Sequence, residues 1–111
     1  MSAKFEILKS KNDKFHFNLK AGNGEVILSS QMYEAKASAL AGVESVRTNS
    51  ALDERFDRKR SAKDEPFFNL LAANGQIVGH SEMYSSPSAM ENGIASVKKN
   101  APAAVLSDLS G

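Results

Sequence analysis

One stretch of the chain occurs twice and determines most of its architecture. The first copy, Asn18-Leu19-Lys20-Ala21-Gly22-Asn23-Gly24, continues to Ser30-Gln31-Met32-Tyr33, and the second, Asn69-Leu70-Leu71-Ala72-Ala73-Asn74-Gly75, continues to Ser81-Glu82-Met83-Tyr84. The copies are offset by 51 residues and align without a gap from Phe5 with Phe56 to Asn49 with Asn100. The chain is therefore a tandem duplication of one structural unit.

Length and composition place both copies in one domain. The chain has 111 residues, of which 41% are hydrophobic, whereas a unit of about 50 residues buries too little apolar surface to fold readily alone. We expect the two repeats to share one core, with the first at residues 4–51 and the second at residues 55–102. The tail, residues 103–111, has no clear period, and we expect it to fray.

The first half of each repeat predicts an antiparallel meander. In the first repeat, Lys4–Ser10 is a short predicted strand, and apolar and polar residues alternate from Phe15 to Ala21, as in a strand buried on one face. Asn23-Gly24 predicts a two-residue type I′ turn, in which both residues have positive φ. A third strand then follows at Val26-Ile27-Leu28.

The second half of each repeat predicts a helix. Apolar residues and one glycine recur at i, i+3, i+4 and i+7, which predicts a helix at about Lys36–Thr48 in the first repeat. The stripes are Ala39, Gly42, Val43, Val46 and Met90, Gly93, Ile94, Val97. Ser86 with Pro87 is a typical helix start, and Asn49 and Asn100 are expected to form left-handed caps. Because glycine is costly inside a helix, its place on both stripes predicts a close approach of helix backbone to sheet.

These elements predict an α+β fold. We expect a tandem repeat of two strand-strand-strand-helix units, with helices packed on one face of an antiparallel sheet and a pseudo-two-fold axis between the repeats. No parallel strand is needed in this arrangement. The charged segment Arg55–Arg60 corresponds to the first strand of the second unit and is expected at a sheet edge. No pattern predicts the strand order between repeats.

The motifs resemble those of the bacterial YegP-like proteins. In that family a strand ends in Phe-x-Leu-x-Ala-x-Asn-Gly, followed by an Ile or Val strand, a Ser-x-x-Tyr and a helix with Gly-Ile-x-Ser-Val. The first copy reads Phe17 to Gly24, Val26-Ile27, Ser30 to Tyr33 and Gly42 to Val46, and the second reads Phe68 to Gly75, Ile77-Val78, Ser81 to Tyr84 and Gly93 to Val97. The resemblance covers about Phe5 to Asn100 and departs at Val43, where Ile is usual. It implies a duplicated member of a family that also has single-unit members, an α+β fold of tandem repeats, and no activity to carry over.

Composition excludes several classes of function. The formal net charge is +1 and cysteine is absent, so the sequence favours neither nucleic-acid nor membrane binding and offers no disulfide or thiolate chemistry. The first residues lack the apolar run of a signal peptide, and no window is long enough to span a membrane. We therefore expect a cytoplasmic protein.

No catalytic constellation is apparent in the sequence. The two histidines, His16 and His80, do not occupy equivalent positions in the repeats, and neither has an acidic residue or a cysteine at a ligand spacing. A Ser/His/Asp arrangement with an oxyanion motif and a phosphate-binding glycine loop are both absent. We predict that the protein is not an enzyme and binds neither metal nor cofactor.

A candidate binding surface comes from polar and aromatic residues that the strand pattern does not require. Asn18 and Asn69 recur on the strand face opposite the core, and Tyr33 and Tyr84 recur just past the third strand, where packing or a ligand would each explain them. Phe67 and Leu71 lie on the outer face of the second repeat only. We expect them to be covered by the other repeat, by the tail or by another molecule. The full candidate set is Asn18, Asn69, Tyr33, Tyr84, Phe67 and Leu71.

The leading functional hypothesis is a small non-enzymatic binding or interaction module, a monomer or weak homodimer, whose partner is a protein or a small ligand. The alternative is a weak nucleic-acid binder that uses the basic edge Arg55–Arg60, although nearby acidic residues favour a solvated edge strand. Third is an enzyme without a recognisable motif.

Overall fold

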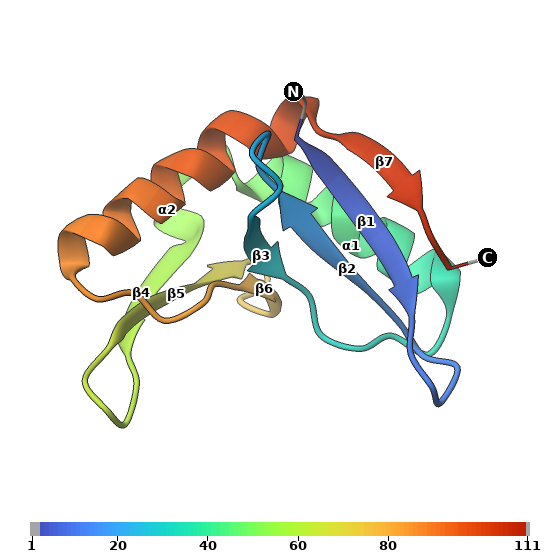
Figure 1. The fold of residues 1–111 in the computed structure, drawn as a ribbon, viewed down its shortest axis with the longest axis horizontal. Helices are drawn as coiled ribbons and strands as arrows, with labels where there is room; N and C mark the ends of the chain where they lie inside the picture. The colour runs from blue at the N-terminus through green and yellow to red at the C-terminus, as the bar shows by residue number, and fades with distance from the viewer. Residues whose placement is uncertain (1–2, 111) are drawn as a thin grey trace.

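The computed structural model describes residues 3–110, which form a seven-stranded sheet and two helices (Figure 1). The strands are β1 (Lys4–Lys9), β2 (Phe15–Lys20), β3 (Val26–Ser29), β4 (Phe56–Arg60), β5 (Pro66–Leu71), β6 (Ile77–His80) and β7 (Val105–Asp108). The helices are α1 (Lys36–Asn49) and α2 (Pro87–Asn100), and 3-10 turns lie at Asp53–Arg55 and Ala101–Ala103. Within the described range, no helix has the length and apolar character needed to cross a membrane.

The two repeats join edge to edge in one sheet of order β4-β5-β6-β3-β2-β1-β7. Each repeat contributes the predicted three-stranded meander, and the meanders meet at β3 and β6 through the antiparallel pair Ser29 and His80. These two residues are equivalent under the offset of 51. The pseudo-two-fold axis therefore passes between them, and the predicted α+β tandem repeat is confirmed.

The prediction of a wholly antiparallel sheet with a frayed tail is wrong. β7 pairs in parallel with β1, where Val105 N donates to Ala3 O at 3.2 Å and Leu109 N donates to Ile7 O at 2.8 Å. A parallel pair requires a crossover connection. Here the connection from β1 to β7 contains all the intervening elements, and α2 with the 3-10 turn after it leads the chain back to β1. β4 lies at the opposite edge, as predicted.

The hairpin turns also differ from the prediction. Gly24 has φ 86° but Asn23 is not in the positive-φ region, so the turn is not type I′. Gly24 N donates to Ala21 O at 2.9 Å and Ala21 N donates to Glu25 O at 2.9 Å, which is the pattern of a three-residue loop with a left-handed glycine. The Asn23 side chain accepts from Glu25 N at 3.0 Å and stabilises this longer loop.

A β-bulge beside each turn changes which residues reach the core. The register of β2 with β3 shifts between Leu19 and Lys20, and such a shift places two successive residues on one face. Ile27 and Leu28 are accordingly both buried, while Val26 is exposed. The same shift occurs between Leu70 and Leu71 in the second repeat.

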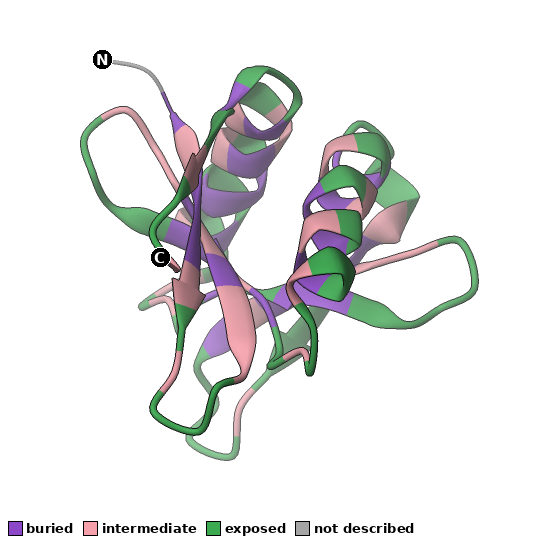
Figure 2. Cartoon of the chain, turned by 90° about the vertical axis from the view of Figure 1, so that its right-hand side faces the viewer, coloured by how far each residue is buried: buried purple, intermediate pink, exposed green. Residues whose placement is uncertain are grey.

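Both helices cover the same face of the sheet and bind the repeats together (Figure 2). α1 packs on β2 of its own repeat and on β5 and β6 of the other, and α2 packs on β5 and on β3. Phe17 and Phe68 are fully buried in matching surroundings, with edge-to-face neighbours Phe5 at 5.9 Å and Phe56 at 5.6 Å between ring centroids. The halves therefore share one core.

The helix ends confirm one capping prediction and contradict another. Ser86 accepts from Ala89 N at 3.1 Å, as expected of an N-cap. Asn49 and Asn100 have helical backbones, so neither is a left-handed cap. Each amide instead donates back to the carbonyl four residues earlier, Asn49 to Ser45 O and Asn100 to Ser96 O, both at 2.8 Å. Each bond ties the last helical residue to a carbonyl one turn earlier and so adds a side-chain contact to the final turn.

Candidate binding site on the helix-free face

A line of polar side chains crosses the sheet on the face away from the helices. Directly paired residues on neighbouring strands point to the same face, and the strand neighbours of Asn18 are the buried core residues Phe17 and Leu19. The cross-strand partners form a continuous series from β7 to β4. This polar row consists of Ser107, Glu6, Asn18, Ser29, His80, Asn69 and Asp57.

The polar row is arranged symmetrically about the pseudo-two-fold axis. Asn18 and Asn69 are equivalent in the two repeats and lie on either side of the central pair Ser29 and His80. The middle of the row is therefore rich in neutral hydrogen-bonding groups, and an acidic residue stands toward each end. Asn18 and Asn69 are three strand intervals apart, which is about 14 Å at the usual strand spacing.

The amide groups of Asn18 and Asn69 are available to a ligand. Within residues 3–110 neither side chain has a hydrogen-bond partner, unlike the amides of Asn49 and Asn100. Asn69 is nonetheless only 7% exposed. Its amide atoms still reach the surface, because the buried side-chain atoms without a partner in residues 3–110 are only His16 Nδ1 and Arg55 Nε. The helix-free face therefore offers two accessible amides with unused bonding capacity.

At one end of the row, the negative charge of Glu6 is paired with two lysines. The Glu6 carboxylate accepts from Lys20 Nζ at 2.9 Å and lies 3.5 Å from Lys4 Nζ. These contacts, chiefly the one with Lys20, lower the pKa of Glu6 from its ordinary value, and burial opposes them. Lys20 is thus committed within the protein rather than available to an anionic ligand.

Phe67 and Leu71 flank Asn69 on β5, and both are half-buried. The expectation that the tail covers them is wrong, because the tail forms β7 at the opposite edge of the sheet. Cover by another molecule stays a prediction. His16, the counterpart of Phe67, has a buried Nδ1 without a hydrogen-bond partner.

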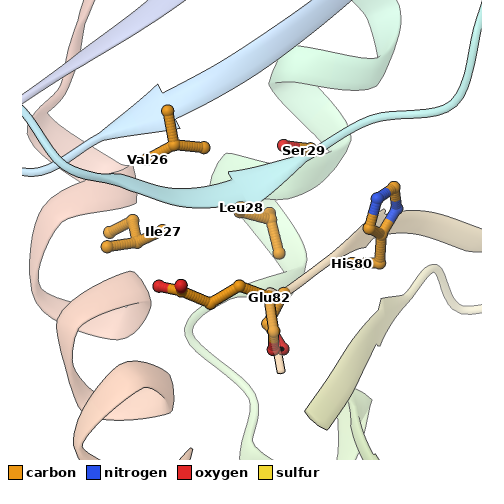
Figure 3. A pocket seen from close by; sticks show the side chains of 7 residues that line it. Val26, Ile27, Leu28, Ser29, His80 and Glu82 are labelled. Carbon is orange, nitrogen blue, oxygen red and sulfur yellow. Dashed lines mark hydrogen bonds between the residues drawn. The ribbon is translucent and has the colours of Figure 1, made fainter. Parts of the chain in front are cut away.

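A notch opens at the centre of the row. β3 and β6 pair through Ser29 and His80 only, and the chain after β6 then diverges from β3. The divergence leaves a cavity of about 250 Å³ lined by Val26, Ile27, Leu28, Ser29, His80, Ser81 and Glu82. Figure 3 shows Ile27 and Leu28 on the same side of β3 as the Glu82 side chain, with Val26 on the opposite side. The lining of the notch therefore includes Ser29 and His80 of the polar row together with Glu82.

Tyr33 and Tyr84 do not join the polar row. Each ring stacks on a core phenylalanine, Phe17 or Phe68, with centroids 6.3 Å apart and planes at 11°. Their hydroxyl groups lie over the helix glycines, where a Cβ at Gly42 or Gly93 would stand 2.6 or 2.1 Å from the oxygen. Burial raises the pKa of both tyrosines. The helix glycines therefore make room for a tyrosine ring between helix and sheet. They do not bring the helix backbone directly against the sheet backbone, contrary to the prediction from the sequence.

Two other recurring polar residues have structural partners. Ser30 Oγ accepts from Phe17 N at 2.9 Å and donates to Gln31 O at 2.8 Å, and Ser81 repeats both contacts. Each serine hydroxyl therefore accepts the backbone N–H of a β2 or β5 phenylalanine at the point where the third strand of the repeat ends.

Sequence reasoning missed Ser29, His80 and Glu82 as parts of the site. In the sequence, His80 aligns with a serine and not with His16, so the repeat pattern gives no reason to expect a site there. The available signal was that Ser29 and His80 occupy the same register position of the third strand, which any two-fold pairing of the repeats would bring together.

The basic edge Arg55–Arg60 is mostly paired with carboxylates. Arg58 contacts Glu91 at 2.6 Å and Asp53 at 3.2 Å, and Lys98 contacts Asp53 at 2.6 Å. The bond to Glu91 is the main cause that raises the pKa of Arg58 above its ordinary value. Arg60 lies 3.3 Å from Asp64. In residues 3–110, no cluster of three or more His, Cys, Asp or Glu side chains is arranged for a metal ion.

The fold and site define a tandem-repeat α+β module with a mixed sheet, helices on one face and a polar row on the other. The sequence profile of one family, described as "Domain of unknown function (DUF1508)", matches residues 10–57 and again residues 61–108. The chain belongs to this family, and the resemblance to YegP-like proteins with a duplicated unit is confirmed.

Relatives and solved structures agree with this assignment. UPF0339 protein YegP of Yersinia pestis is 54% identical over 105 residues, which cover 95% of this chain and 94% of that protein. The solution NMR structure of UPF0339 protein SO3888 from Shewanella oneidensis is 51% identical, with a TM-score of 0.93 over 99% of this chain and 93% of that one. The solution structure of yegP from E. coli, a protein of unknown function, is 47% identical, with a TM-score of 0.94 over 100% of this chain and 96% of that one. These descriptions assign no activity to the family.

Proposed function

We propose that the protein is a non-enzymatic binding module that holds an extended peptide segment across the helix-free face of its sheet. The observation that carries this proposal is the polar row, in which Asn18 and Asn69 lie on either side of Ser29 and His80 and their amides have no hydrogen-bond partner within residues 3–110. The module acts as a monomer or weak homodimer. A cytoplasmic location is part of this proposal.

The chemistry of the two asparagines suits a peptide backbone. A carboxamide offers both an acceptor oxygen and N–H donors, and the N–H and C=O of one residue in an extended chain point to the same side. One asparagine side chain can therefore bond both groups of one residue. An extended chain rises about 3.4 Å per residue, so four residues span about 14 Å. Asn18 and Asn69 would therefore hold residues four positions apart, with the central residue over Ser29 and His80.

Charge pairing favours a peptide over a nucleic acid. Phosphate binding requires free lysine and arginine side chains, whereas Lys20 is paired with Glu6 and Arg58 is paired with Glu91. The formal charge of +1 supplies no general attraction for a polyanion. The half-buried Phe67 and Leu71 beside Asn69 also offer contact area to apolar peptide side chains.

The test is a titration of the labelled protein with a pool of uncharged eight-residue peptides, followed by amide chemical shifts. Shifts are expected around Asn18, Ser29, Asn69 and His80. Asn18→Ala and Asn69→Ala should each weaken binding about fivefold or more, because each loses at least one hydrogen bond worth about 1 kcal/mol. Asn92→Ala, on the exposed side of α2, is the matched control and should bind as the native protein does.

Two results would contradict the proposal. The first is saturable shifts confined to β4 with a strong dependence on salt and on added oligonucleotide, which would favour the nucleic-acid alternative. The second is peptide binding that both asparagine variants leave unchanged, since the polar row would then not be the site.

A further inference from the structure

The notch beside Ser29 and His80 has no equal counterpart across the pseudo-two-fold axis. A Cβ built at Gly79 would lie 2.7 Å from Leu28 Cδ2 and 2.8 Å from Leu28 Cγ. The Leu28 side chain thus occupies the space beside its counterpart in the second repeat. The residue equivalent to Glu82 is the neutral Gln31. The lining of this notch is therefore chemically different from the equivalent positions across the axis, with a leucine for a glycine and a carboxylate for an amide.

The size of the notch suits one side chain. Sites for drug-sized molecules and cofactors occupy about 300–1,000 Å³, and this cavity measures about 250 Å³. Its lining includes Ser29 and His80, which also form the centre of the polar row. A peptide held by Asn18 and Asn69 would place its central residue over these two residues.

The lining of the notch defines the kind of side chain. Ile27 and Leu28 form an apolar wall on the side of β3 where the Glu82 carboxylate lies, and Val26 lines the opposite side (Figure 3). Within residues 3–110 no lysine or arginine pairs with Glu82. Long basic side chains place an alkyl stem on apolar surface and keep the charged end at a polar group.

We infer that the notch binds a lysine or arginine side chain from the central residue of the peptide, with its stem against Ile27 and Leu28 and its charge at Glu82. This inference rests on the proposed function and adds a sequence preference to it. The charged environment is consistent, because burial and then the charges of Glu82 and Glu25 raise the pKa of Tyr84.

The experiment compares three acetylated and amidated heptapeptides that differ at the fourth position. The central residue is lysine, arginine or norleucine, with alanine elsewhere, and binding is measured from amide shifts at low salt. The basic peptides should bind about two- to fivefold more tightly than the norleucine peptide, the range of a solvent-exposed ion pair. In Glu82→Gln, which installs the amide found at Gln31, this preference should vanish while norleucine binding is unchanged. Glu65→Gln is the charge-matched control and should keep the preference.

The possible outcomes distinguish failure of the notch inference from failure of the proposed peptide-binding function. If all three peptides shift Asn18 and Asn69 with equal affinity, the notch inference is wrong and the binding module stands. If Glu82→Gln weakens all three peptides alike, the residue has a structural effect and the inference is again wrong. If no peptide shifts Asn18 or Asn69, the proposed function itself fails. A larger preference for arginine than for lysine would indicate paired hydrogen bonds to the carboxylate.

Discussion

Leu28 of β3 and Gly79 of β6 occupy the same position in the two repeats, and the leucine side chain fills the space that the glycine leaves empty. This large–small pair packs the sheet where the meanders meet. Its closest approach, 2.7 Å from an added Cβ to Leu28 Cδ2, is well inside normal contact distance.

Gly79→Ala is therefore expected to destabilise the fold by about 1–3 kcal/mol, the usual cost of overpacking a core. Leu28→Ala alone should cost about 2–5 kcal/mol through the cavity that it leaves. The double variant Leu28→Ala/Gly79→Ala should be more stable than the sum of the single effects implies, with a coupling of about 0.5–3 kcal/mol. Urea denaturation of the four proteins measures this cycle, and strict additivity would show that the two side-chain positions do not meet.

Tyr84 and Gly93 form a second tight pair, between the sheet and α2. Alanine is normally better than glycine inside a helix by about 1 kcal/mol, but here its Cβ would stand 2.1 Å from Tyr84 Oη. We expect Gly93→Ala to lower the midpoint of thermal unfolding. Tyr84→Phe should recover part of the loss because it removes the clashing oxygen. Ala95→Gly, in an exposed turn of the same helix, is the control for propensity alone. A rise in the unfolding midpoint of Gly93→Ala would contradict the packing described.

Glu6 makes the stability of the protein depend on pH. Its pKa in the folded protein is lowered, chiefly by the Lys20 hydrogen bond, from the ordinary value of 4.5. A lowered carboxyl pKa stabilises the fold above that ordinary value, and the stabilisation is lost as the pH falls below 4.5 through the folded value. Between pH 7 and pH 3, the native protein should lose about 1 kcal/mol more unfolding free energy than Glu6→Gln. Equal losses in the two proteins would mean that this carboxylate is not held as described.

β7 protects the outer edge of β1. Removal of residues 105–111 should expose the edge groups that now bond Val105 and Leu109, and an open edge favours pairing between molecules. We expect the shortened protein to be less stable and to associate as its concentration rises, as measured by sedimentation. Asp108→Asn, which breaks the 2.8 Å contact with Lys36, is the milder comparison and should only speed amide exchange in β7. A shortened protein that stays monomeric with native stability would contradict a structural role for β7.

Local patterns predicted the repeats, the meanders and the helices because each is encoded within a few residues. Alternation placed Asn18 on the outer face, and the helical stripe placed Val46 and Val97 in the core. The parallel strand β7 was missed because its pairing depends on β1, about a hundred residues away in the chain, and four residues show too little alternation to reveal a strand. The type of hairpin turn was missed because a bulge, not the Asn-Gly pair alone, sets the loop length.

The site was predictable in part. Asn18 and Asn69 were found because a polar residue that recurs in both copies stands out from the pattern. Their alignment with Ser29 and His80 depends on which strands join the repeats, and no local signal specifies that. Tyr33 and Tyr84 were grouped with them, but packing on Gly42 and Gly93 separates them from the row.

The difference between Leu28 and Gly79 is possible in a single polypeptide but not in a dimer of two identical subunits. In a homodimer built from one such unit, the residue at this position would face its own copy. Two leucines would then collide and two glycines would leave a hole. Because the two units are covalently linked, these two positions can carry different residues. The surface of the duplicated protein is therefore asymmetric, and a segment bound across it would have one preferred orientation.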